Sequence, residues 1–217
     1  MLGIIVAVSE ELTEVLKIFD KVEEEIYRNK TFYISDKTVV VQCGVGKVNA
    51  ALTTQMLIDK YDVKKVINIG VAGSVDNSLN IGDIVVANKL VQYDFDLTAF
   101  GRKLGEMSNI GEYISVDPSL INIFKTKNVK IGCISSGDKF VNDIDLKNFI
   151  REHFAALCVE MEGASIAQVC FVNKIPCIVI RSISDKLDGT STIEYDKFVC
   201  ESSKNVASLL ENIIGEL

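Results

Sequence analysis

The sequence predicts an α/β fold in which a mixed central β-sheet is flanked by helices. Short apolar runs rich in β-branched residues alternate with segments of helical periodicity, which is typical of strands alternating with helices. Clusters of small and acidic residues follow directly after those apolar runs. In addition, 48% of the 217 residues are hydrophobic, only two are proline, and no Gly/Ser-rich stretch marks a linker. We therefore expect one domain over residues 1–217 with a substantial core.

The first part of the chain predicts a buried strand, a helix and a hairpin. Residues 2–8 form a continuous apolar run, as expected for a strand buried on both faces. Ser9 is a good N-cap for a helix over residues 10–19, whose first turn is acidic. The β-prone residues 31–35 and 38–42 are separated by two polar residues and therefore predict a hairpin.

The next part predicts a helix and two further strands. Apolar residues recur with helical spacing over roughly residues 47–60. Residues 66–69 predict a second buried strand, and residues 83–93 predict a third. The irregular stretch at residues 94–109 is long for a compact domain, and such loops are usually functional.

The second half of the chain continues the alternation. Asp117 and Pro118 stand in the preferred order for the start of a helix, with the cap residue before the proline. The other predicted elements are strands at residues 131–135, 157–159 and 176–180, and helices at residues 143–154, 163–173 and 195–214.

Charge and hydropathy exclude several kinds of partner. The 23 basic and 30 acidic residues give a net charge of −7 with no clustered basic run, so no nucleic-acid partner is expected. The apolar start lacks the basic flank and cleavage site of a signal peptide. Uncharged segments such as residues 66–75 and 163–173 are far shorter than the ~18 residues that a membrane span needs. We expect a cytoplasmic protein with no membrane contact.

Metal and thiol chemistry is not indicated. The six cysteines are dispersed among apolar neighbours without Cys-x-x-Cys spacing, which is typical of buried, reduced thiols. His153 is the one histidine, so a zinc site lacks ligands and any histidine-dependent triad depends on that residue. We expect no metal and no cofactor.

Six polar or glycine-rich segments follow predicted strands directly. In open α/β sheets the ligand crevice lies outside the carboxyl ends of the strands, so these segments are expected at one rim. The segments are residues 9–11, 44–46, 70–73, 136–138, 160–162 and 184–185.

The Gly-Val-Gly sequence at residues 44–46 resembles half of a dinucleotide-binding fingerprint. Asn49 stands where the third glycine belongs, and the segment follows a hairpin strand rather than the first strand. The alternative is a loop whose glycines let a ligand or a neighbouring chain approach the backbone closely.

Three carboxyl groups are stronger evidence for a functional site than the Gly-Val-Gly segment. Glu160 and Glu162 lie between an apolar strand and an apolar helix, where buried, unpaired carboxylates would be costly. The alternative is an acidic pair at a helix start, favoured by the macrodipole. Asp185 follows the next strand and could merely cap a turn. Together, Glu11, Glu162 and Asp185 would place three carboxyl groups around one crevice, where differing environments can separate an acid from a base.

The chain resembles the 5′-methylthioadenosine/S-adenosylhomocysteine nucleosidase family, within the wider purine nucleoside phosphorylase fold. The resemblance extends from Gly3 to the terminal helix, and its eight motifs occur in order. They are residues 3–5 with Glu10 and Glu11, then residues 44–51, 68–73, 82–86, 96–101, 136–141, 159–164 and 181–185.

The resemblance implies cleavage, by water and without metal, of the N-glycosidic bond between adenine and a 5′-thio-substituted ribose. Glu11 matches the general base that activates water, and Asp185 matches the acid that protonates purine N7. Met161 and Glu162 match the segment that holds the ribose hydroxyls. Such a reaction leaves positive charge on the sugar, so a carboxylate near the ring is useful. Because an aspartic acid ordinarily titrates at ~3.9, Asp185 should be desolvated or hydrogen-bonded in its acid form.

Further substrate contacts are implied in the same way. Phe140 matches a ring stacked on adenine, and the backbone of Val141 matches the group that reads the purine edge. Gly73 and Arg181 match residues of the ribose and water region. Phe100 matches a residue donated across a homodimer interface to cover the 5′-alkylthio group. The other expected substrate-binding residues are Val8, Val45, Glu160, Ser184 and Tyr195.

Four positions depart from the family pattern. Val71 replaces a serine near the water, and Tyr195 stands where phenylalanine is frequent. Arg102 and Ser108 replace a tyrosine and a proline of the partner-chain lid. These changes leave the choice of 5′-substituent open.

Three other functions compete with this one. A phosphorylase would need cationic groups for phosphate, yet the chain has four arginines and Glu11 would repel the dianion. A futalosine-type nucleosidase would use the same three carboxyl groups with another 5′ pocket. A non-catalytic nucleoside sensor would keep the pocket without needing Glu11 or Asp185.

Overall fold

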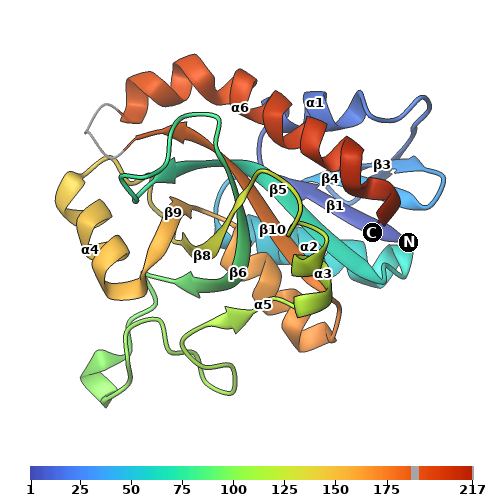
Figure 1. Cartoon of the computed structure of the whole chain (residues 1–217). Helices are drawn as coiled ribbons and strands as arrows, with labels where there is room; N and C mark the ends of the chain where they lie inside the picture. Colours follow the sequence, from blue (N-terminus) through green and yellow to red (C-terminus); the bar gives the residue numbers. More distant parts are fainter. Residues whose placement is uncertain (187–190, 217) are drawn as a thin grey trace.

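The computed structural model describes residues 1–186 and 191–216 and confirms the predicted α/β class with a mixed sheet (Figure 1). The strands are β1 (Leu2–Val6), β2 (Glu23–Tyr27), β3 (Lys30–Ser35), β4 (Thr38–Gln42), β5 (Lys65–Ser74), β6 (Ile84–Gln92), β7 (Ile114–Ser115), β8 (Lys130–Ser136), β9 (Ala156–Glu160) and β10 (Cys177–Asp185). The helices are α1 (Ser9–Leu16), α2 (Lys47–Tyr61), α3 (Pro118–Asn122), α4 (Ile144–Phe154), α5 (Gly163–Asn173) and α6 (Ser191–Ile213), with 3-10 turns η1 (Thr98–Phe100) and η2 (Ile214–Glu216).

The sheet closes on itself at one end. The strand order is β10-β6-β8-β9-β5-β1-β4-β3-β2, and β10 also pairs with β5, so β10, β6, β8, β9 and β5 form a ring. β1 pairs in parallel with β4 and β5, and β5 pairs in parallel with β10. β9 runs antiparallel to β5 and meets it only at Gly73 and Ser74. This short overlap brings the ends of the two strands together.

Helices cover the sheet on both sides. α1 and α6 pack on each other and α6 packs on β5 and β10, whereas α2 and α5 pack together on the opposite side (Figure 1). α4 packs on β8 and β9. All nine residues of β10 are buried, the apolar residues at its start as well as the polar and charged residues near its end.

The helix starts agree only in part with the sequence. The Asp117 side chain accepts a 2.8 Å hydrogen bond from Ser119 N, and Asp143 accepts one of 2.8 Å from Leu146 N, so both residues cap helices. The prediction of Ser9 as an N-cap is wrong, because Val8 holds that position. The Glu11 carboxylate accepts from the backbone N–H of Val8 and makes a side-chain cap at Ser9 unnecessary.

Strand lengths also differ from expectation. β5 and β10 continue through residues 70–73 and 181–185, which the sequence placed after the strands. β2 was missed because Glu23, Glu24 and Glu25 give no alternation of apolar and polar residues. In the part of the chain that the structure describes, no helix is both long and apolar enough to cross a membrane. All six cysteines are free thiols, and only Cys200 is exposed.

Candidate active site

A cavity of about 460 Å³ opens where β1, β5, β9 and β10 end. Of its fifteen described lining residues, three are the predicted catalytic carboxyl residues and eight more are residues predicted to bind substrate. The lining residues are Ala7, Val8, Glu11, Val45, Val71, Ala72, Gly73, Phe140, Val159, Glu160, Met161, Glu162, Ser184, Asp185 and Tyr195.

Backbone N–H groups hold the buried carboxyl group of Glu11. Its Oε2 accepts hydrogen bonds from Ala7 N at 2.7 Å and Val8 N at 3.2 Å, and its Oε1 accepts from Val71 N at 2.9 Å. Burial raises the pKa of Glu11, while Arg181 and the three N–H donors act against that rise. The substitution at Val71 therefore removes a hydroxyl group but keeps a backbone contact to Glu11.

Two glycines of β5 let carboxyl groups approach the strand. A Cβ at Gly70 would lie 2.5 Å from Glu11 Oε1, and one at Gly73 would lie 2.8 Å from Asp185 Oδ2. Both distances are too short for a side chain, so the closeness of the carboxyl groups requires glycine. Three strand residues span about 10 Å, which separates the points where Glu11 and Asp185 contact β5.

Glu162 shares its surroundings with a buried ion pair. Its Oε1 accepts a 2.8 Å hydrogen bond from Gly46 N, so the Gly-Val-Gly segment binds a side chain of the site. Burial and the neighbouring Glu160 raise the pKa of Glu162 to about 8, against the opposing effect of Arg181. Glu160 is ion-paired with Arg181 and also accepts hydrogen bonds from the backbone N–H of Glu162 and Gly163.

Asp185 has a cationic partner behind the cavity wall. Lys147 of α4 is fully buried, and its Nζ lies 3.0 Å from Asp185 Oδ2. Ser184 Oγ donates to Asp185 Oδ1 at 3.0 Å. Lys147 Nζ also donates to the backbone oxygen of Lys186 at 2.5 Å, which fixes the ammonium group beside the end of β10. Asp185 is buried and accepts hydrogen bonds from Lys147 and Ser184, while its acid form stays a prediction.

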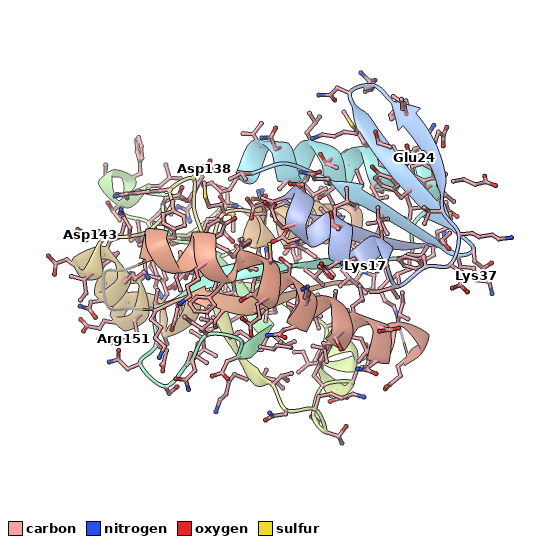
Figure 2. All side chains as sticks on the ribbon, turned by 90° about the horizontal axis from the view of Figure 1, so that it is seen from above. Lys17, Glu24, Lys37, Asp138, Asp143 and Arg151 are labelled. Carbon is pink, nitrogen blue, oxygen red and sulfur yellow. The ribbon has the colours of Figure 1, made fainter. Side chains whose placement is uncertain are left out.

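Aromatic and aliphatic side chains form the rest of the wall. The rings of Phe140 and Tyr195 meet edge to face with centroids 5.7 Å apart. Lys47 N donates to Asp138 Oδ1 at 2.7 Å, which ties the loop that carries Phe140 to α2. Figure 2 shows Asp138 and Asp143, which bracket this loop, on the α4 side of the molecule, away from the end that bears Lys17, Glu24 and Lys37.

Three predicted site residues do not line this cavity. The Val141 side chain is buried against a smaller apolar cluster, although the expected contact from this residue involves its backbone. Arg181 lies behind the wall, where it also bonds Asn68 Oδ1. Phe100 is 82% exposed on η1, which projects from the body of the molecule (Figure 1).

The sequence offered no signal for a role of Lys147 other than its place on the helix, and it placed Ser136 at the rim without a role. Lys147 shares a helix face with the buried Ile150 and Phe154, and a lysine at a core-facing position was the available signal. The Ser136 hydroxyl hydrogen-bonds to Glu160 Oε1 and accepts from Ala164 N, so it joins β8 to the start of α5. Among the described residues, no group of three His, Cys, Asp or Glu side chains is arranged to hold a metal ion.

The closed ring of strands with a carboxyl-lined cavity indicates an α/β enzyme, and comparison with known proteins identifies its relatives. A model of the phosphorylase superfamily matches residues 1–215. The chain is 37% identical over 228 residues to the 5′-methylthioadenosine/S-adenosylhomocysteine nucleosidase of Staphylococcus haemolyticus, covering 100% of both chains. It is also 38% identical over 229 residues to the aminodeoxyfutalosine nucleosidase of Campylobacter jejuni, covering 100% of this chain and 99% of that one.

Solved structures agree with these relatives. The 5′-methylthioadenosine/S-adenosylhomocysteine nucleosidase of Helicobacter pylori with butyl-thio-DADMe-Immucillin-A matches with a TM-score of 0.96 and 37% identity, covering 100% of this chain and 98% of that chain. The chain therefore belongs to the 5′-methylthioadenosine/S-adenosylhomocysteine nucleosidase family within the phosphorylase superfamily. The predicted family and enzyme class are confirmed.

Proposed function

We propose that this enzyme hydrolyses the N-glycosidic bond of 5′-methylthioadenosine and S-adenosylhomocysteine, and also of 5′-deoxyadenosine, releasing adenine and the 5′-substituted ribose. Asp185 protonates purine N7, Glu11 activates the attacking water, and Glu162 binds the ribose hydroxyls. The observation that carries the proposal is the convergence of these three buried carboxyl groups on one cavity with an aromatic wall.

The environments of the carboxyl groups suit these roles. Departure of adenine requires a proton at the base and leaves positive charge on the sugar. Glu11 and Glu162 lie together at one end of the cavity, and either carboxyl group would stabilise that charge in its ionised form. A raised pKa makes the Glu11 carboxylate a stronger base toward water than an exposed carboxylate.

Hydrolysis is favoured over phosphorolysis by the charges around the cavity. None of the described lining residues is lysine or arginine. Arg181 is already paired with Glu160, and Arg102 and Arg151 pair with glutamates elsewhere. A phosphate dianion would therefore meet carboxyl groups rather than cations.

An aminodeoxyfutalosine-type nucleoside is a second candidate substrate. The C. jejuni relative of that name is as similar to this chain as the S. haemolyticus relative. Both substrate types place the same bond in reach of the same carboxyl groups and differ in the 5′ substituent. The apolar side chains of Val8, Val45 and Tyr195 favour the alkylthio substituent.

A homodimer would complete the 5′ side of the cavity. Phe100 lies outside its own chain's cavity, and Val45, Val48 and Leu52 form a further exposed apolar group at the start of α2. Exposed apolar groups of this kind mark interaction surfaces. Sedimentation of a fully active monomer at working concentration would contradict the proposed role of Phe100 in the partner's site.

The decisive experiment is an adenine-release assay on 5′-methylthioadenosine with and without phosphate, with the sugar product identified. The proposal expects phosphate-independent release and free 5-methylthioribose. A requirement for phosphate, with a sugar 1-phosphate product, would establish phosphorolysis instead. Release only from an aminodeoxyfutalosine-type nucleoside would identify the second candidate, and no release from any nucleoside would support the sensor.

A further inference from the structure

Lys147 is a fully buried lysine that has no part in the reaction described above. Its Nζ lies 3.0 Å from Asp185 Oδ2 and 2.5 Å from the backbone oxygen of Lys186. It projects from α4, which packs on β8 and β9, and it reaches the end of β10. A buried ammonium group is costly unless it is paired, so its position beside one particular carboxyl group needs an explanation.

The reaction changes the charge of Asp185. When Asp185 gives its proton to purine N7, the C1′–N9 bond breaks and its electron pair goes to the purine, which leaves as neutral adenine. Water forms the new bond to C1′ and passes a proton to Glu11. Asp185 is then a buried carboxylate; before the next turnover Glu11 releases its proton to solvent and Asp185 takes one up. A nearby fixed cation stabilises that carboxylate as it forms.

We propose that Lys147 is a positioning residue for Asp185: its ammonium group orients the carboxyl group and receives the negative charge that proton donation creates. This inference rests on the proposed function. Ser184 Oγ donates to Oδ1 and Lys147 donates to Oδ2, so each oxygen retains acceptor capacity and the carboxyl plane is fixed. Lys147 reaches Asp185 from outside the cavity and leaves the substrate side open.

Within residues 1–186 and 191–216, the other charged or titratable groups around Asp185 are already paired or neutral. On β9, burial raises the pKa of the Cys158 thiol, which stays neutral, and Glu160 is paired with Arg181 of β10. Lys186 Nζ donates to Asn80 Oδ1 at 3.3 Å. Tyr195 of α6 contacts Phe140 across the cavity. Lys147 is therefore the cation in direct contact with Asp185 among the described residues.

The ammonium group should have two opposite effects on the pH profile. It stabilises the Asp185 carboxylate that forms on proton transfer, which raises kcat. It also favours loss of the Asp185 proton before the reaction, so the alkaline decline of activity begins at a lower pH. In Lys147→Met we therefore expect kcat to fall by roughly 10- to 100-fold, since one charge-assisted hydrogen bond is lost. The alkaline decline of kcat should move to higher pH, and KM should change much less than kcat.

The test compares pH profiles of adenine release by the wild type, Lys147→Met and Lys147→Arg. The arginine variant keeps the charge and should keep the wild-type alkaline decline. Lys127→Met, which breaks an ion pair with Glu216 far from the cavity, is the matched control and should behave as the wild type. If Lys147→Met does not fold, Lys147→Gln removes the charge while keeping an N–H donor.

Two further comparisons decide between positioning and a purely structural role. In the Asp185→Asn background, Lys147→Met should reduce kcat little further, because the lysine acts through the aspartate. A fall in kcat with an unmoved alkaline decline, or no fall at all, would overturn the proposal.

Failure of the proposed function is distinguishable from failure of this inference. If the wild type releases no adenine, the ionisation of Asp185 can still be followed by ¹³C-carboxyl NMR, with its signal assigned from Asp185→Asn. The Asp185 signal should titrate at higher pH in the neutral Lys147 variant than in the wild type. An unchanged titration would overturn the inference whatever the enzyme's substrate.

Discussion

The two ends of the cavity stabilise buried carboxyl groups in different ways. At one end, Glu11 is held by three backbone N–H groups, and Glu162 by one, with Arg181 committed to Glu160. At the other end, Asp185 has the ammonium group of Lys147 as a direct partner. The first end thus has more carboxyl groups than cations, whereas the second end has one carboxyl group and one cation.

This difference teaches how one cavity can hold a base and an acid. Burial raises the pKa values of Glu11 and Glu162 at the first end, and the backbone N–H groups oppose that rise without supplying a counter-charge, so these carboxyl groups favour proton uptake from water. A lysine at the second end provides a full counter-charge for the carboxylate that forms there. Variants should therefore respond differently at the two ends, in stability as well as in turnover.

Asp185→Asn should have the largest effect. It removes the proposed proton donor and leaves the Lys147 ammonium group buried without its carboxylate partner. We expect adenine release to fall on the order of 10³-fold or more and the free energy of unfolding to fall by about 3 kcal/mol. Steady-state kinetics and urea unfolding measure the two effects. Retained turnover would remove the assignment of Asp185 as the acid.

Glu11→Gln should separate activity from stability. Loss of the base should lower turnover by about 10²- to 10³-fold. The new amide group places an NH₂ against one backbone N–H, which is destabilising. Because a buried charge is also removed, we expect the loss of stability to be only about 1 kcal/mol. If Glu11→Gln lost as much stability as Asp185→Asn, the contrast between the two ends of the cavity would be wrong.

The sequence predicted the sheet and the carboxyl cluster because both follow from local patterns. Apolar runs marked the central strands, and acidic residues after them marked the rim. It did not predict that β9 would meet β5 antiparallel at Gly73, since strand pairing across the ring depends on residues far apart in the chain. The acidic residues that follow β9 nevertheless lie at the rim that the sequence predicted, because the ends of β5 and β9 overlap there.

The sequence could not predict how the carboxyl groups are partnered. The partners of Glu11 are backbone groups whose positions depend on the fold, and Lys147 is 38 residues from Asp185 along the chain. Residues 44–46 left two interpretations open, and the structure shows Gly46 N bound to Glu162. These contacts involve residue pairs that no local pattern connects.

Arg181→Met tests the charge balance at the first end. The guanidinium group is buried and paired with Glu160, and it also lowers the pKa values of Glu11 and Glu162. Its removal leaves an unpaired buried carboxylate, so we expect the free energy of unfolding to fall by about 3 kcal/mol. Urea unfolding measures this loss. Arg102→Met breaks an exposed ion pair with Glu106 and should leave stability near the wild-type value.

A further effect concerns how stability depends on pH. The pKa of Glu162 is raised from 4.5 to about 8, so the native protein holds a proton there that the unfolded chain releases above its own, lower pKa. Stability from this group is therefore complete below about pH 4.5 and is lost as pH rises toward 8, by about 1.4 kcal/mol per pH unit at most. Glu162→Gln should reduce this decline when urea unfolding is measured at several pH values.

The slope should shrink rather than vanish, because Glu11 also has a raised pKa and contributes a decline of the same sign. Surface carboxyl groups with lowered pKa values, such as Asp62 and Asp96, act in the opposite direction and at lower pH, where they lose stabilising contacts on protonation. Equal slopes in the wild type and in Glu162→Gln would mean that Glu162 ionises as readily as an exposed carboxyl group. The first end of the cavity would then not disfavour ionisation of its carboxyl groups, and the contrast with the Asp185–Lys147 pair would lose its basis.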